Sequence, residues 1–132
     1  MNALLVGIGG GIGSVLRYLL TLGASHPIAV VFAINISGAF LLGVVTMMTS
    51  GRCRLFLGTG ILGGFTTYSA FAVDTVRLFH DDVVAGLLYP IGSVVAGILA
   101  AWLGMRCTTW SRSTPAVIRE RKRKPVRGGP EK

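Results

Sequence analysis

Hydrophobic residues form four long stretches in this chain, and short polar segments separate them. The stretches run from about Ala3 to Leu22, Ile28 to Thr49, Leu55 to Leu78 and Val83 to Met105. A helix needs about 20 mostly apolar residues to cross a bilayer, and each stretch is that long. The pattern therefore predicts an all-α membrane protein with four transmembrane helices.

Polar residues and aromatic rings interrupt the third stretch between Gly63 and Phe71, which reads Gly-Gly-Phe-Thr-Thr-Tyr-Ser-Ala-Phe. Glycine costs about 1 kcal/mol relative to alanine inside a helix, and two glycines close to Thr66 and Thr67 favour a break. Free backbone groups at membrane depth must be buried in protein or line a cavity. We therefore expect the third helix to be broken in mid-membrane, at a site for an ion or solute.

Polar side chains in the other stretches are further candidates for this site. Arg17 is the only charged residue between Met1 and Gly51, and it either packs and snorkels or attracts anions in a vestibule. Asn35 needs hydrogen-bond partners, which it could find on a neighbouring helix or along a pore. Tyr89 and Ser93 are four residues apart, so they share one helical face.

Charge supports the membrane assignment and predicts an orientation. Only 14% of the residues are charged, compared with about 25% in soluble domains. With four spans, both termini and the second loop share one side, which carries eleven Lys and Arg residues, while Arg77 is the only one on the other side. Because positive loops stay inside, both termini are predicted to be cytoplasmic.

The chain divides into a transmembrane unit, residues 1–105, and a basic tail, residues 106–132. We expect the tail to be a disordered cytoplasmic segment because it combines charge and proline without apolar periodicity. Its position beside a transmembrane helix favours anionic lipid headgroups as partners and argues against nucleic acid.

Enzyme chemistry is not indicated. No carboxylate pair lies within a span, the two histidines lie in different loops, and no metal-ligand spacing is present. Cys53 and Cys107 lack a paired motif, and we expect both to be reduced thiols.

Three segments carry a resemblance to a known family. They are residues 10–18 (Gly-Gly-Ile-Gly-Ser-Val-Leu-Arg-Tyr), residues 35–43 (Asn-Ile-Ser-Gly-Ala-Phe-Leu-Leu-Gly) and residues 60–71, which end in Thr-Thr-Tyr-Ser-Ala-Phe. In this order, on the first three spans, they are similar to the signature segments of the Fluc (CrcB) fluoride channels. The resemblance covers about residues 3–105.

The resemblance implies an antiparallel, dual-topology dimer in the cell membrane that exports fluoride passively and protects the cell from it. It implies a sodium ion at the dimer interface, held by backbone carbonyls of Gly63 and Thr66. It assigns aromatic rings, an asparagine and a polar track to the fluoride path, at Tyr68, Phe71, Asn35, Tyr89 and Ser93. Thr67 and Ser69 add hydroxyl groups that can donate hydrogen bonds to the ion.

Two departures and the charge bias refine this expectation. The family's break usually reads Thr-Thr-Phe-Ser-Thr-Phe, whereas here Tyr68 adds a hydroxyl and Ala70 removes one. A subunit that inserts in both orientations should show little bias in basic residues, so we expect this chain to pair with a second homologous chain of opposite orientation. The alternatives are a non-conducting pairing subunit and a small membrane scaffold. A proton-coupled multidrug exporter is disfavoured, because the first span contains no carboxylate.

Overall fold

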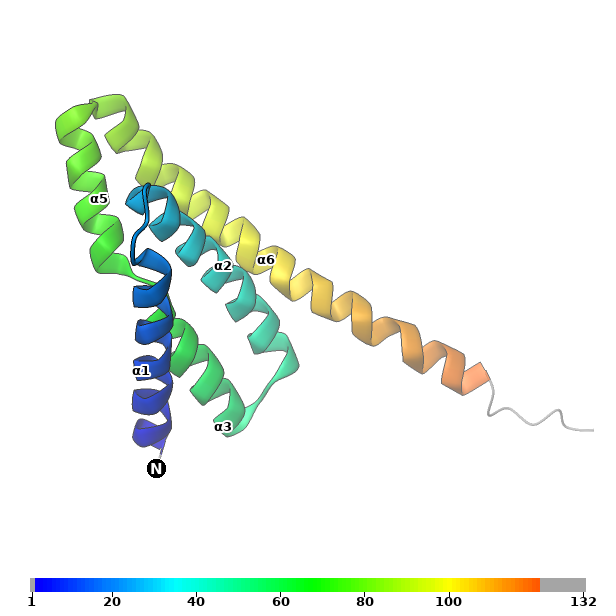
Figure 1. Cartoon of the computed structure of the whole chain (residues 1–132). Helices are drawn as coiled ribbons and strands as arrows, with labels where there is room; N and C mark the ends of the chain where they lie inside the picture. Colours follow the sequence, from blue (N-terminus) through cyan, green and yellow to red (C-terminus); the bar gives the residue numbers. More distant parts are fainter. Residues whose placement is uncertain (1, 122–132) are drawn as a thin grey trace, which may run out of the picture.

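The computed structural model describes residues 2–121, with side chains as far as Thr109. Its helices are α1 (Asn2–Thr21), α2 (Pro27–Met48), α3 (Gly51–Arg54), η1 (Leu55–Leu62), α4 (Gly63–Phe65), α5 (Tyr68–Asp81) and α6 (Val83–Arg121) (Figure 1). The segments from α3 to α5 form a single span, and four spans are long and apolar enough to cross a membrane. The prediction of an all-α membrane protein with four transmembrane helices is confirmed.

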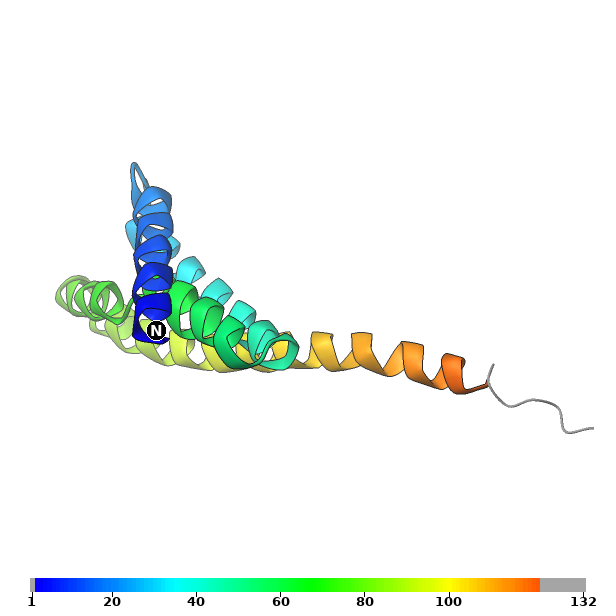
Figure 2. The ribbon, with the colours of Figure 1, turned by 90° about the horizontal axis from the view of Figure 1, so that it is seen from below.

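The spans pack in pairs around the third one. The N-terminus and α3 lie at one end of the molecule, and the turns before α2 and before α6 lie at the other end (Figure 1). α2 and α5 pack against α6, whereas α1 packs against η1 and α4. In the view from below, α1 and α6 lie on opposite sides of η1 (Figure 2). The third span therefore contacts all three other spans, since α1 and α2 contact η1 and α4, and α6 contacts α5.

Glycines allow α1 to approach the third span closely. A methyl group at Gly13 would overlap the carbonyl of Ile61, and one at Gly64 would overlap the carbonyl of Gly10. Small residues of this kind let helix backbones pack tightly in lipid, where no hydrophobic force drives association. Gly64 is therefore part of a packing surface.

The interruption of the third span lies at Thr66 and Thr67, and not at the glycines. Gly63 and Gly64 belong to the short helix α4. The hydrogen-bond pattern of the preceding π-helix η1 continues into it, since the Gly63 amide donates to the Gly58 carbonyl. Thr66 then has a ψ of 155° and Thr67 a φ of −141°, both extended. The expected break is thus displaced towards the threonines, where a side chain can cap the next helix.

α6 continues beyond the boundary that we expected after residue 105. It remains helical to Arg121, and residues 122–132 lie outside the described part of the chain, so the disordered cytoplasmic tail over residues 106–132 stays a prediction. Arg106 lies 4.8 Å over the ring of Trp102, one turn earlier. The Thr108 hydroxyl donates to the Met105 carbonyl at 2.8 Å. These local contacts favour continuation of the helix.

Candidate functional site

A cavity of about 400 Å³ lies beside the interruption. It brings together most of the site residues predicted from the sequence, namely Asn35, Gly63, Thr66, Thr67, Tyr68, Phe71 and Ser93. They come from α2, the third span and α6. The wall of this central cavity is otherwise mainly small or aliphatic, so its few polar groups are isolated in apolar surroundings.

Asn35 holds the interruption in place. Its Nδ2 donates to the Thr67 carbonyl at 3.1 Å, and its Oδ1 accepts from the Thr67 amide at 2.8 Å. The amide of Thr67 therefore binds a side chain of α2 and does not continue the helical ladder to Gly63. Of the two roles considered for Asn35, interhelical bonding is observed, and one hydrogen of Nδ2 remains for a ligand in the cavity that Asn35 also lines.

The two threonines use their hydroxyl groups locally. Thr66 Oγ1 donates to the Leu62 carbonyl at 3.0 Å. Thr67 Oγ1 accepts from the Ala70 amide at 3.2 Å and so caps the start of α5, and it lies 3.2 Å from Ser69 Oγ. Gly38 of α2 makes room for the Thr66 methyl group, which a Cβ there would overlap. The hydroxyls of both threonines thus stabilise the interruption itself.

Aromatic rings form a series from the interruption towards the far end of the molecule. The ring centroids of Tyr68 and Phe71 are 5.9 Å apart, those of Phe71 and Tyr89 are 5.5 Å apart, and those of Tyr89 and Phe32 are 6.4 Å apart. The sequence predicted three of these residues and missed Phe32, although Phe32 lies three residues before Asn35. Tyr68 begins the series with 81% of its surface exposed, so this ring projects out of the subunit.

Two hydroxyl groups on α6 are buried and have no hydrogen-bond partner among the described residues. They are Tyr89 Oη and Ser93 Oγ. The Tyr89 ring stacks on Phe71, and Ser93 lines the central cavity. Buried hydroxyls normally have partners, so these groups are available to a ligand that the subunit does not itself supply.

A second cavity, of about 490 Å³, lies on the other side of the interruption and contains Arg17. Ser69 and Asp74 also line it, and Thr67 lines both this Arg17 cavity and the central cavity. Arg17 Nε is buried and has no partner in the described part of the chain. This burial agrees with packing as well as with the predicted vestibule, and the role of Arg17 stays a prediction.

Asp74, three residues before Arg77, was not among the site residues predicted from the sequence. The two form an ion pair at 4.0 Å, but Asp74 is just 5% exposed, and its Oδ2 has no partner within residues 2–109. Asp74 follows Phe71 by three residues and therefore shares its helical face. This spacing from Phe71 is the sequence feature that could have pointed to Asp74.

The fold defines a class, the small all-helical membrane proteins with four spans, in which the interrupted third span borders a cavity. Residues 4–105 match the family described as "CrcB-like protein, Camphor Resistance (CrcB)". The chain belongs to this family, which consists of fluoride ion channels and not of enzymes.

Relatives in three bacteria resemble the chain over most of their length. A "Fluoride-specific ion channel FluC" of Rhizobium meliloti is 42% identical, and the match covers 79% of this chain and 93% of that protein. A protein of the same name in Thermus thermophilus is 43% identical, with 78% and 90% covered. "Fluoride-specific ion channel FluC 2" of Rhodococcus jostii is 40% identical, with 83% and 100% covered.

Proposed function

We propose that this chain is one subunit of a fluoride-specific channel that exports fluoride passively and lowers its concentration in the cytoplasm. The observation that carries this proposal is the pair of buried hydroxyls, Tyr89 Oη and Ser93 Oγ, that have no partner among the described residues and lie beside the Phe71 ring. Fluoride is small and strongly hydrated, so a path must replace its water with hydrogen-bond donors. Two such donors lie along one face of α6.

The rings support the same role without a fixed charge. Aromatic edges carry positive potential, so the series from Tyr68 to Tyr89 can face an anion through ring edges. A basic residue in the narrow part would hold fluoride too firmly, because conduction requires sites that release the ion. In agreement with this, the central cavity is lined by no Lys or Arg among the described residues.

A structural sodium ion fits the interruption. The Thr67 amide is engaged by Asn35, so it leaves the Gly63 carbonyl without this helical donor, and Gly63 and Thr66 both line the central cavity. The described residues contain no group of three His, Cys, Asp or Glu side chains that could hold a metal, which leaves backbone oxygens as ligands. The carbonyls of Gly63 and Thr66 would hold sodium, and its charge would offset the charge of passing anions.

A second subunit would complete this site. Tyr68 is 81% exposed beside the central cavity, and two carbonyls from a single chain are too few for a cation. We infer an antiparallel dimer in the cell membrane, in which this chain has both termini in the cytoplasm. The strong bias of basic residues further favours a homologous partner chain of opposite orientation over a second copy of this chain.

Fluoride efflux from liposomes tests the proposal directly. The purified chain is reconstituted alone and with its homologous partner, and chloride efflux serves as the control. Rapid fluoride efflux without chloride efflux is expected with the partner present. Absence of fluoride efflux in both preparations would contradict the channel function and leave a scaffold as the better assignment.

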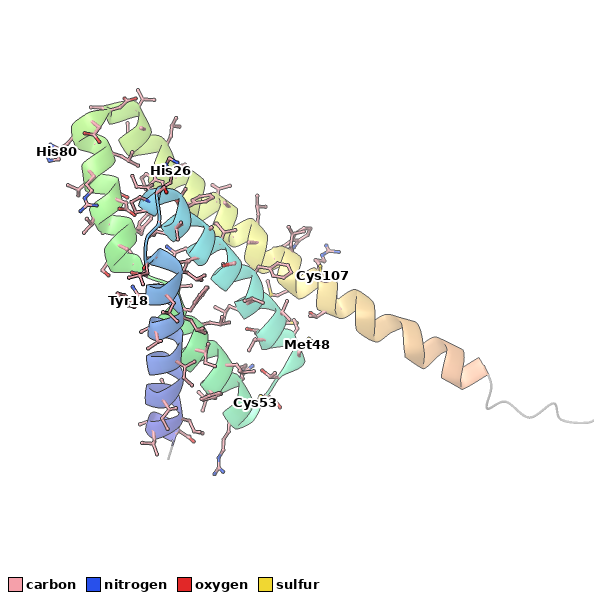
Figure 3. All side chains as sticks on the ribbon, in the orientation of Figure 1. Tyr18, His26, Met48, Cys53, His80 and Cys107 are labelled. Atoms are coloured by element: carbon pink, nitrogen blue, oxygen red, sulfur yellow. The ribbon has the colours of Figure 1, made fainter. Side chains whose placement is uncertain are left out.

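The orientation can be measured separately with a native reporter. Cys53 and Cys107 are both free and exposed, and they lie on different helices (Figure 3). In a Cys107→Ser variant, an impermeant thiol reagent should label Cys53 only from the cytoplasmic side. Comparable labelling from both sides would show dual insertion and would refute the obligate partner while leaving the channel function standing.

A further inference from the structure

A third cavity, of about 290 Å³, extends from the central cavity towards α3. Leu42, Thr46, Arg54, Gly58 and Thr59 line it. Leu42 and Gly58 also line the central cavity, so the two spaces are neighbours. We call this third space the α3 cavity, and it lies near the end of the third span that Cys53 marks in Figure 3.

The three cavities form a series through the subunit. Leu42 and Gly58 line both the α3 cavity and the central cavity, and Thr67 lines both the central cavity and the Arg17 cavity. Each outer cavity has an arginine in its wall, Arg54 at one end and Arg17 at the other. The sequence from Leu55 to Val76 between Arg54 and Arg77 contains no Lys or Arg.

The side chain of Arg54 is placed by the helix that it precedes. Its Cγ lies 3.9 Å from the position that a Cβ on Gly58 would occupy, so the aliphatic stem packs over this glycine. Gly58 is buried, whereas Arg54 is exposed. Arg52 lies on the same short helix, is equally exposed and does not line the α3 cavity. The two arginines therefore share their helix and their charge, but only Arg54 lines the α3 cavity.

We propose that the α3 cavity is the entrance of the fluoride path on the side of the membrane that carries α3, and that Arg54 concentrates fluoride there. This inference rests on the proposed function. A positive charge at the rim of a cleft with low-dielectric walls raises the local concentration of anions. At the rim, unlike in the narrow part, the charge does not trap the ion. The Thr59 hydroxyl beside it adds a possible donor.

The test compares Arg54→Ala with Arg52→Ala in the complete channel. Fluoride efflux from liposomes is measured at low ionic strength and again in about 1 M of an impermeant salt. Arg54→Ala should reduce efflux about three- to tenfold at low ionic strength, and Arg54→Glu should reduce it further. High salt should remove most of the difference, because the screening length falls to about 3 Å. Arg54→Lys should retain efflux, and Arg52→Ala should leave it unchanged.

Several outcomes separate the alternatives. Equal losses in Arg52→Ala and Arg54→Ala would overturn the proposal and indicate that both residues bind lipid headgroups. A loss in Arg54→Ala that persists in high salt, or that Arg54→Lys does not restore, would indicate a structural role and also overturn it. If the unsubstituted channel conducts no fluoride, the proposed function fails and this inference fails with it. If that channel conducts and Arg54→Ala has no effect, only the inference fails.

Discussion

The interruption of the third span and the inner face of α6 both place polar groups at membrane depth, but they treat these groups in opposite ways. Around the interruption, both ends of the Asn35 amide bind the Thr67 backbone, and the Thr66 hydroxyl binds a carbonyl. On α6, the hydroxyls of Tyr89 and Ser93 are buried without a partner in the described part of the chain.

This difference separates structural from ligand-binding groups. In lipid, no water is available to satisfy a free backbone group, so the interruption can persist only because α2 supplies the missing bonds. A buried hydroxyl without a partner lowers stability, and its presence is explained if an ion completes it. Substitutions in the first region should therefore reduce stability, whereas substitutions in the second should reduce fluoride flux alone.

The largest expected effect comes from Asn35→Ala. This change leaves both the amide and the carbonyl of Thr67 without partners, at about 1–3 kcal/mol for each buried group. We expect the free energy of unfolding in detergent to fall by about 2–6 kcal/mol and fluoride efflux to be lost. Equilibrium unfolding followed by far-UV circular dichroism provides the first value, and liposome efflux the second.

Ser37→Ala is the matched control on the same helix. The Ser37 hydroxyl donates to the Ile34 carbonyl of its own helix, at 3.0 Å. Its removal should therefore change neither the free energy of unfolding nor fluoride efflux appreciably. If Asn35→Ala were as stable as Ser37→Ala, the Thr67 backbone would have found other partners, and the structural role of Asn35 would be refuted.

The next effect concerns Ser93→Ala and Tyr89→Phe. Each change removes a buried hydroxyl that makes no bond within the described residues, so the free energy of unfolding should not fall and should rise by up to about 1–3 kcal/mol, the cost of leaving such a group unsatisfied. A hydrogen bond to a charged group contributes about 1.5–3 kcal/mol, so fluoride efflux should fall about tenfold or more in each variant.

Flux and stability must be measured on the same preparations for this comparison, with Ser37→Ala as the control for loss of a serine hydroxyl. A marked loss of stability in Ser93→Ala would show that its hydroxyl has a structural partner. Unchanged efflux in both variants would remove the α6 hydroxyls from the fluoride path.

Thr67→Ala should have a smaller effect, confined to the interruption. The Thr67 hydroxyl caps α5 by accepting from the Ala70 amide, and loss of such a cap costs about 1 kcal/mol. Thr75→Ala is the control, because the Thr75 hydroxyl only bonds back to the Phe71 carbonyl inside α5. A lower melting temperature in detergent is expected for Thr67→Ala alone, and equal shifts in both variants would argue against the capping role.

The sequence predicted the elements better than the details of their contacts. Apolar stretches of sufficient length predicted four spans, because the hydrophobic requirement of a bilayer leaves few alternatives. The break was predicted between Gly63 and Phe71, but its exact position was not, since propensity alone cannot show that Asn35 of another helix would engage the Thr67 amide. The burial of Asp74 and the place of Phe32 beside Tyr89 depend on how α5 and α2 pack against α6, which local patterns do not specify.

The smallest expected effect is that of Tyr68→Phe, and it tests where the ring series meets the second subunit. Tyr68 is 81% exposed, and among the described residues its hydroxyl has no hydrogen bond to lose, so stability should not change. The lone pairs of the Tyr68 oxygen repel an anion in a path beside it. Without this oxygen, the anion meets only the ring edge, which carries positive potential. We expect fluoride efflux to rise about two- to threefold. A large loss of efflux would instead make the Tyr68 hydroxyl a necessary donor, and the unsatisfied groups would then extend from α6 to the interruption itself.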